Sequence, residues 1–166
     1  MDSKVKLYLE RAENEIIIAK TNFEISTSLE LKDILKISKE KTFFNNVISQ
    51  CYYSIFYAAK AYLLSKEIRT YAPEEHRKTY EAFEKFVISG ELDRQLLDIY
   101  NSEREKAEVL LDIFHLEKGK RGRFTYNINA NANIPFAKES LENARTFVSI
   151  IKRIIEESYA KYNFSS

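Results

Sequence analysis

The sequence is poor in the residues that form tight turns, disulfides and metal centres. Only three glycines and two prolines occur in 166 residues, and because hairpin turns depend on such residues, a strand-rich fold is excluded. The one cysteine, Cys51, has no partner for an intramolecular disulfide, and its apolar surroundings predict burial. The two histidines, His76 and His115, form no Cys/His group with metal-ligand spacing. We therefore expect no metal and no cofactor.

A dominant charge and a long apolar run are also missing. The 26 basic and 25 acidic residues leave a net charge of +1, so a polyanion would have to be held by a local cluster of basic residues. No stretch approaches the roughly 18 apolar residues of a membrane span, and residues 1–6 lack the apolar region of a signal peptide. We expect a cytoplasmic protein that does not associate with a membrane.

The remaining composition and pattern predict helices. A chain that is 45% hydrophobic and 31% charged can form a core and a solvated surface, and its apolar residues recur at spacings of three and four. We predict an all-α, up-and-down helical bundle of about five helices, forming a single domain over residues 1–166. The helices are expected over about 3–25, 42–66, 73–89, 91–116 and from 135 onward, with a short weaker helix over 29–37.

The helix over 42–66 is predicted to be central. Small residues follow one another along one of its faces, which lets a neighbouring helix approach closely, and aromatic residues flank them. The small-residue stripe consists of Val47, Cys51, Ser54, Ala58 and Ala61. Tyrosines also cluster on this helix, at Tyr52, Tyr53 and Tyr57; core packing is the simpler interpretation and a ligand pocket the alternative.

A basic turn is the first candidate for chemistry. Two glycines allow backbone amides to approach an anion, arginine offers a planar fork for phosphate, and the following aromatics could stack on bases. The residues concerned are Lys118, Gly119, Lys120, Arg121, Gly122, Arg123, Phe124 and Tyr126. The alternative is a solvated turn between helices, as most charge runs are.

Arg104 and His76 are two further candidates. Arg104 interrupts an apolar helix face, so it is either ion-paired with Glu103 or Glu108 or lines a groove. His76 falls in the first turn of its helix, where the helix dipole favours a neutral imidazole. A local hydrogen bond is its simplest role, and a general base or an RNA contact is the alternative.

These residues carry a resemblance to a known family. The central segment from Asn46 to Leu64 resembles the signature helix of HEPN domains, approximately YYA-x-F-x-A-x-K-A-x-L. Arg121 to Tyr126 resembles the family's Arg-x-x-x-x-Tyr motif, His76 the start of the following family helix, and residues 137–144 the entry into the last helix. The similarity follows nearly the whole chain in order and spacing.

The resemblance implies a helical bundle that forms a homodimer. Many HEPN proteins are ribonucleases with an Arg-x(4–6)-His motif, whereas others bind nucleotides or pair with a nucleotidyltransferase as toxin and antitoxin. Here Arg121 matches the arginine, but Tyr126 stands at the histidine position, and a phenol with a pKa near 10 is a poor base at neutral pH. Arg104 could instead be the family arginine. The string Arg69-x6-His76 also fits, although its position in the chain does not.

Three hypotheses follow for the function. In the first, Lys120, Arg121, Arg123, Tyr126 and Arg104 bind a nucleotide or RNA, within a toxin–antitoxin or nucleotidyltransferase-associated system. In the second, the protein is a metal-independent endoribonuclease whose catalytic residues come from Arg121, Tyr126 and His76. In the third, the bundle docks a minimal nucleotidyltransferase. The first needs no motif histidine and is preferred.

Overall fold

The computed structural model of the chain describes residues 1–111 and 133–164. Six α-helices occur in this part of the chain, and none of its residues lies in a strand. The all-helical bundle predicted from the sequence is therefore confirmed. The helices are α1 (Ser3–Thr27), α2 (Leu29–Ile34), α3 (Phe44–Ser65), α4 (Glu75–Ile88), α5 (Arg94–Leu111) and α6 (Ile134–Phe164).

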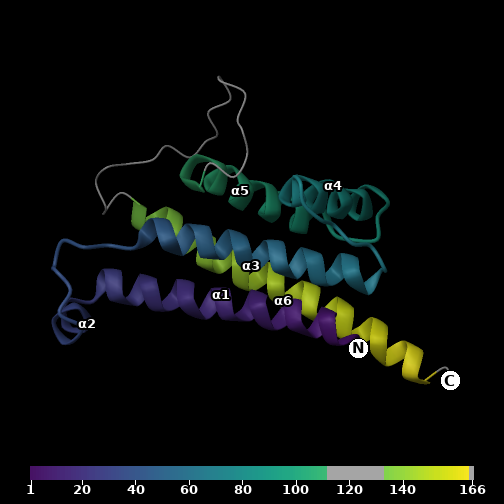
Figure 1. Cartoon of the computed structure of the whole chain (residues 1–166), viewed down its shortest axis with the longest axis horizontal. Helices are drawn as coiled ribbons and strands as arrows, with labels where there is room; N and C mark the ends of the chain where they lie inside the picture. Colours follow the sequence, from purple (N-terminus) through teal and green to yellow (C-terminus); the bar gives the residue numbers. More distant parts are fainter. Residues whose placement is uncertain (112–132, 165–166) are drawn as a thin grey trace.

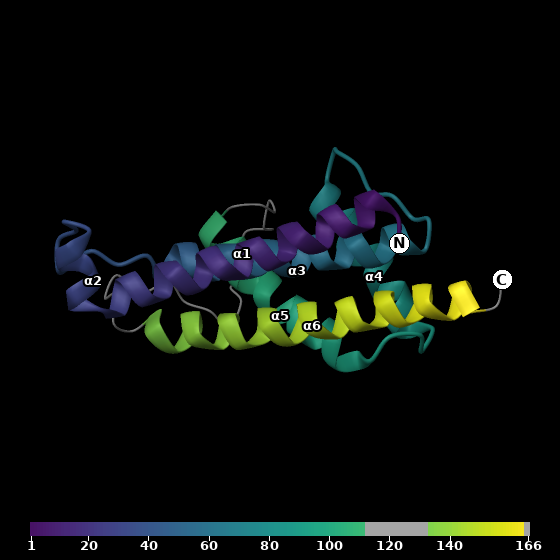
Figure 2. The same ribbon diagram turned by 90° about the horizontal axis from the view of Figure 1, so that it is seen from below.

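Helix α3 lies at the centre of the bundle, as its composition predicts (Figure 1). It packs against α1, α4, α5 and α6, whereas α1 contacts only α2, α3 and α6. Helices α4 and α5 therefore form a short layer on the side of α3 that faces away from α1. Figure 2 shows α1, α3 and α6 lying side by side, with α1 antiparallel to the other two.

The stripe of small residues on α3 is buried in the core, and one member, Ser54, contacts α1. All five members are completely buried: Val47, Cys51, Ser54, Ala58 and Ala61. Opposite them on α1, Ala12 and Ala19 are also fully buried, and Ser54 Oγ donates a hydrogen bond of 2.8 Å to the Ala12 carbonyl. A side chain can reach the backbone of the neighbouring helix only where no larger residue separates them.

Aromatic rings fill the core on the opposite side of α3. Phe83 of α4, Tyr100 of α5 and Phe147 of α6 are fully buried. Their ring centroids are 5.4–5.8 Å apart, a range in which edge-to-face and tilted pairs each contribute about 0.5–1.5 kcal/mol beyond the buried area. These three rings join the layer of α4 and α5 to α6 in the core.

The predicted helix starts are correct for α1 and too early for α4 and α5. Asp2 caps α1, because its side chain accepts a 2.7 Å hydrogen bond from the Lys4 amide. Helix α4 begins at Glu75, after Glu74 in the left-handed conformation (φ 60°), so Pro73 precedes its first turn. Helix α5 begins only at Arg94.

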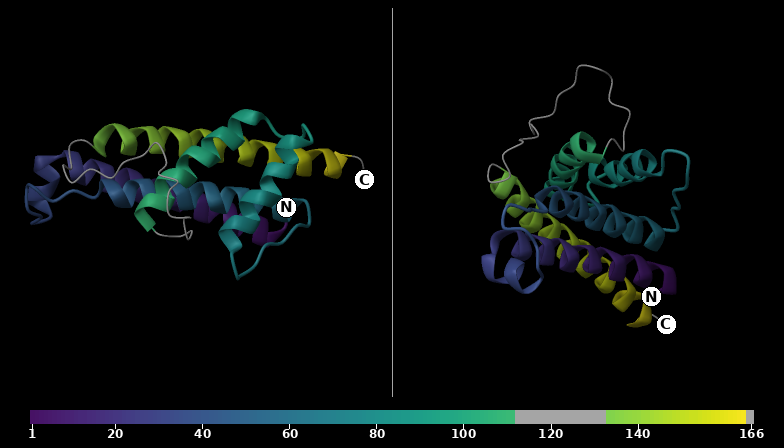
Figure 3. Two further views of the ribbon diagram at one scale, coloured as in Figure 1. Left: turned by 90° about the horizontal axis from the view of Figure 1, so that it is seen from above. Right: turned by 60° about the vertical axis from the view of Figure 1, so that its left-hand side comes forward.

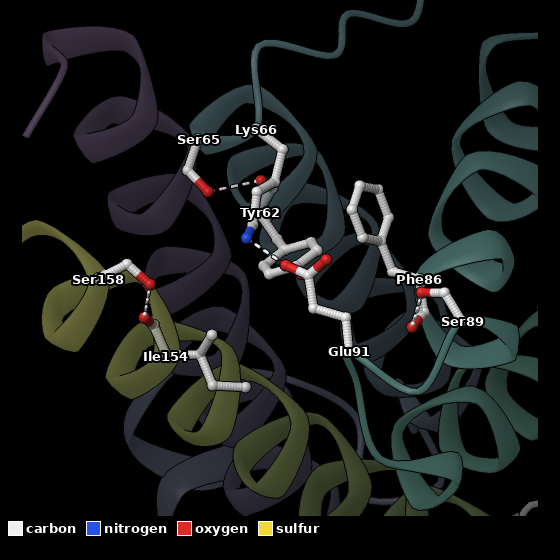
Figure 4. Close-up of polar contacts among 8 residues, drawn as sticks. All are labelled: Tyr62, Ser65, Lys66, Phe86, Ser89, Glu91, Ile154 and Ser158. Atoms are coloured by element: carbon white, nitrogen blue, oxygen red, sulfur yellow. Dashed lines mark hydrogen bonds and ion pairs between the residues drawn. The ribbon is translucent and has the colours of Figure 1, made fainter.

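Glu91 joins the connection between α4 and α5 to the end of α3 (Figure 4). Its carboxylate accepts a 3.0 Å hydrogen bond from the Tyr62 hydroxyl and forms an ion pair with Lys66. The hydrogen bond from Lys66 holds the pKa of Glu91 below its ordinary value. Ser89 Oγ closes α4 by donating to the Phe86 carbonyl at 3.0 Å. The connection is thus tied to the end of α3.

Helix α2 lies at the end of the bundle opposite the two chain termini (Figure 3). Ser28 caps it by accepting a 3.2 Å hydrogen bond from the Leu31 amide. The buried Ser26 at the end of α1 accepts a 2.8 Å hydrogen bond from the Phe43 amide, which leads into α3. In the described part of the chain, no helix combines the length and apolar character that spanning a bilayer requires.

Candidate functional site

The candidate residues of the basic turn cannot be placed. Lys120, Arg121, Arg123 and Tyr126 all fall within 112–132, outside the described residues, so their convergence on a pocket stays a prediction. His76 and Arg104 are described, and both lie in the layer that α4 and α5 form on α3.

His76 is held by α3 from the first turn of α4. Its Nδ1 shares a 2.8 Å hydrogen bond with the hydroxyl of Tyr52. Its ring stacks on Phe56, with centroids 4.1 Å apart and planes inclined by 18°. Tyr52 and Phe56 are four residues apart and so lie on one face of α3. The sequence predicted a local hydrogen bond for this histidine, whereas the observed bond joins it to a residue 24 positions away on another helix.

The environment of His76 favours the neutral imidazole. Burial lowers the pKa of His76; the carboxylate of Glu75 opposes this shift, and the ammonium of Lys60 adds to it. At neutral pH the ring can therefore accept a proton at one nitrogen while it donates one at the other. Those properties are required of a general base.

Arg104 projects from α5 toward the same layer. Its Nε lies 3.0 Å from Glu108 Oε1, and the side chains are 22% and 13% exposed. The guanidinium carbon lies 4.4 Å from the centroid of the Tyr80 ring on α4, a cation–π contact. Of the two partners predicted, Glu108 is correct. Glu103 instead pairs with Lys106 at 2.9 Å and is completely buried.

Tyr52 connects the histidine and the arginine. Its side chain is completely buried, and burial raises the pKa of its hydroxyl well above the ordinary value, while Arg104 is the strongest charge acting in the opposite direction. The Tyr52 hydroxyl therefore bonds to His76 and lies within the electrostatic reach of Arg104. We call His76, Tyr52, Tyr80, Arg104 and Glu108 the His76–Arg104 site.

This site combines groups that suit a phosphate ester. A guanidinium stabilises anionic oxygen, a neutral imidazole can take a proton, and the Tyr80 ring supplies an aromatic face. Burial raises the pKa of Glu108, and Arg104 counteracts that shift.

Sequence reasoning missed Tyr52 as a member of the site. The tyrosine cluster on its helix was the available signal, yet only the fold separates its members. Tyr52 faces His76, whereas the Tyr57 hydroxyl accepts a 2.7 Å hydrogen bond from Arg11 of α1. Arg69 and His76 do not share the site: Arg69 lines a separate pocket with Lys4 and Lys60.

Metal ligands do not gather in this region. Within residues 1–111 and 133–164, no three His, Cys, Asp or Glu side chains are grouped so that they could hold a metal ion. The polar groups of the described part of the site are the imidazole, guanidinium, phenol and carboxylate named above.

Comparison with known proteins identifies one relative by sequence. No protein-family model matches the chain. The sequence is 31% identical, over 104 residues, to a protein of Methanocaldococcus jannaschii named "Putative toxin MJ0142". The match covers 52% of this chain and 69% of that protein. The chain therefore belongs to the same protein family as this Methanocaldococcus protein.

Proposed function

We propose that the protein is the toxin component of a toxin–antitoxin pair, with an HEPN-like bundle that binds RNA or a nucleotide through phosphate contacts. The name of the Methanocaldococcus relative supports the biological role. The molecular role is argued from the Tyr52 hydroxyl, which shares a hydrogen bond with His76 and lies within the electrostatic influence of Arg104. His76 and Arg104 are 28 positions apart and belong to different helices, α4 and α5.

A salt titration tests phosphate binding. Short single-stranded RNA and ATP are titrated into the protein at low and raised ionic strength, and affinity for RNA should fall with a slope of about −0.7 per phosphate contact in a plot of log affinity against log salt. Absence of binding at low salt would contradict the proposal. The Arg121→Ala/Arg123→Ala variant, tested in parallel, measures how much of the affinity comes from the basic turn.

Arg104→Lys isolates the role of the guanidinium. The substitution keeps the charge and removes the forked donor, so RNA affinity should fall by about tenfold if Arg104 contacts phosphate. Arg94→Lys is the matched control, because Arg94 also forms an i,i+4 ion pair on α5, with Asp98, and its side chain is 75% exposed. Equal affinities of the two variants would argue against a phosphate contact at Arg104.

A ribonuclease activity is the second candidate, and it is favoured by His76, whose Nδ1 shares a 2.8 Å hydrogen bond with the Tyr52 hydroxyl and whose pKa burial lowers. The imidazole would take the proton of a ribose 2′-hydroxyl as its oxygen attacks the adjacent phosphorus. The bond from phosphorus to the 5′-oxygen then breaks, that oxygen receives a proton, and a 2′,3′-cyclic phosphate forms. Arg104 or Arg121 would stabilise the added negative charge on phosphorus.

Cleavage in the presence of chelator tests this second candidate. Labelled RNA is incubated with wild type and with His76→Asn, which keeps a hydrogen-bonding atom near the Nδ1 position and removes the base. Loss of about 100-fold in rate is expected for removal of a general base. If the wild-type protein leaves the RNA intact, the ribonuclease candidate is wrong and only the binding role remains.

Growth assays and co-purification test the biological role. Expression of the wild-type chain should arrest growth, and Arg104→Lys should relieve the arrest while Arg94→Lys does not. The preferred antitoxin is a small nucleotidyltransferase encoded by a neighbouring gene, which could modify Tyr126. Co-expression should restore growth and give a complex on purification, and growth unaffected by the wild-type chain would contradict a toxin role.

We further propose that the protein acts as a homodimer, an expectation that rests on the HEPN resemblance. Sedimentation equilibrium of the purified chain should give twice its mass of 19.5 kDa. A monomer at the concentrations used for RNA binding would contradict a site shared between two copies.

A further inference from the structure

A basic pocket lies at the end of the bundle where α1 begins and α3 ends. It encloses about 90 Å³. Its walls come from α1, from the last turns of α3 and from the connection between α3 and α4. The lining residues are Lys4, Tyr8, Lys60, Leu64, Ile68, Arg69, Thr70 and Tyr71.

The pocket concentrates positive charge in a chain that is almost neutral. Three of its eight lining residues are cationic and none is acidic, whereas the whole chain has a net charge of +1. Among the described residues, the side chains of Lys4 and Arg69 have no carboxylate within ion-pair distance. Lys60 is paired with Glu75, so the two cations without a carboxylate partner are the ones that attract an anion.

Lys60 forms the fixed part of this charge. Its side chain is only 10% exposed and pairs with Glu75 of α4. Its ammonium lies 4.9 Å from the centroid of the Tyr8 ring and 5.6 Å from that of Phe56. These contacts hold the ammonium in one place, so an anion that enters the pocket meets a preorganised charge.

Aromatic and apolar side chains line the remainder of the pocket. Tyr71 is 61% exposed and Ile68 37% exposed, although both are large apolar residues that burial would stabilise. Tyr8 is partly buried and stacks on Tyr57, with centroids 6.3 Å apart. A flat ring could therefore be accommodated beside the three cations, against Tyr71 or Tyr8.

We propose that this pocket binds a nucleotide phosphate, with Lys4, Lys60 and Arg69 contacting the phosphate and Tyr71 contacting the base. The chemistry fits a free mononucleotide and a nucleotide within an RNA strand equally, because both present a phosphate next to a planar base. The pocket and the His76–Arg104 site share no lining residue, although Lys60 also pairs with Glu75 beside His76 and lowers the pKa of His76. Lys4 and Arg69 therefore carry the test of the pocket.

Calorimetric titration of the full chain at low salt tests the proposal. The probes are AMP, adenosine, inorganic phosphate and a short single-stranded RNA. The Lys4→Gln/Arg69→Gln variant should bind AMP or the RNA about tenfold more weakly than wild type, because two charge-assisted contacts are lost. Both side chains are exposed, so the variant should fold normally, which circular dichroism checks.

Lys78→Gln/Lys85→Gln is the matched control. Both lysines are exposed on α4, lie outside the pocket and have no ion-pair partner in the described part of the chain. The control removes the same net charge and should bind as wild type does. If the pocket variant and the control bind every probe equally, the pocket is not a phosphate site and the proposal is wrong.

Tyr71→Ala tests the contact with the base. AMP affinity should fall to that of inorganic phosphate, whereas phosphate affinity should not change. If Tyr71→Ala loses affinity for AMP and for phosphate to the same extent, Tyr71 does not contact the base. Binding of AMP identifies a free nucleotide as a ligand, and binding of RNA alone identifies a nucleotide within a strand.

Two variants separate phosphate binding in this pocket from the function proposed for the His76–Arg104 site. Arg104→Lys should leave AMP binding at the pocket unchanged, and Lys4→Gln/Arg69→Gln should leave Tyr52, His76 and Arg104 in place. If Lys4→Gln/Arg69→Gln still arrests growth and its affinity for AMP is unchanged, the pocket does not bind the phosphate, and the proposed toxin role is unaffected.

Discussion

At the scale of single residues, His76 makes stability depend on pH in a predictable direction. Its pKa is lowered on folding from the ordinary value of 6.5, chiefly by burial. The unfolded chain therefore takes up the proton first as the pH falls. The contribution of this residue to stability is complete above about pH 6.5 and is lost as the pH falls through the lower pKa of the folded state.

Chemical denaturation between pH 7.5 and 5 tests this prediction. The wild-type midpoint should decrease below about pH 6.5, and His76→Asn should decrease less, because asparagine does not titrate. His115 is present in both proteins and cancels from the comparison. Parallel curves for the two proteins would show that His76 is not protonated more readily in the unfolded chain.

The contacts of single residues also show which interactions could be predicted from the sequence. The Arg104–Glu108 pair could be predicted because four residues of helix bring the two side chains together on one face. The Tyr52–His76 hydrogen bond could not, because it joins residues 24 positions apart and depends on how α4 lies on α3. Chain spacing predicts contacts within a helix, whereas contacts between helices depend on packing.

At the scale of elements, a buried charged network joins α5 to α6. Glu103 Oε1 accepts hydrogen bonds from Lys106 at 2.9 Å and from Asn143 at 2.8 Å. Lys106 also bonds to Glu139 at 2.7 Å. Because Glu103 is fully buried and Lys106 is 4% exposed, neither charge can be solvated by water if the other is removed.

Lys106→Met should therefore destabilise the protein by about 3 kcal/mol, since it leaves the Glu103 charge buried without a counterion. Glu103→Gln/Lys106→Met should lose less stability, because no buried charge remains and the glutamine still accepts a hydrogen bond from Asn143. Arg153→Met is the control: Arg153 and Glu157 form an exposed pair, for which about 1 kcal/mol or less is expected. Urea denaturation measures all three, and a double variant less stable than Lys106→Met would refute the buried-charge explanation.

The helices themselves were predictable, and their exact starts were not. Apolar periodicity locates each helix because a buried face must repeat with the helical turn. Helix α4 starts after Glu74 in a left-handed conformation, and the chain before α5 is held by the contacts of Glu91 with Tyr62 and Lys66. Apolar periodicity contains neither the backbone conformation of one residue nor a contact between helices.

At the scale of the whole molecule, the arrangement of helices around α3 predicts one cooperative unfolding transition. Four helices pack on α3, so loss of any one exposes part of the same core, and the prediction of a single domain over residues 1–166 requires this behaviour. Far-ultraviolet circular dichroism reports the helices, and near-ultraviolet dichroism reports the 11 tyrosines without interference from tryptophan. The two thermal curves should coincide, and two separate midpoints would indicate more than one domain.

The position of α3 has a consequence for how the backbone exchanges hydrogen with solvent. Its residues are buried along most of its length by helices on both sides. Amides of α3 should therefore exchange with deuterium only when the entire bundle opens, whereas those of α2, at the far end, exchange through local fraying. The segment that carries Tyr52 and Phe56 is thus the most slowly exchanging part of the chain, and the support for His76 persists through every smaller fluctuation.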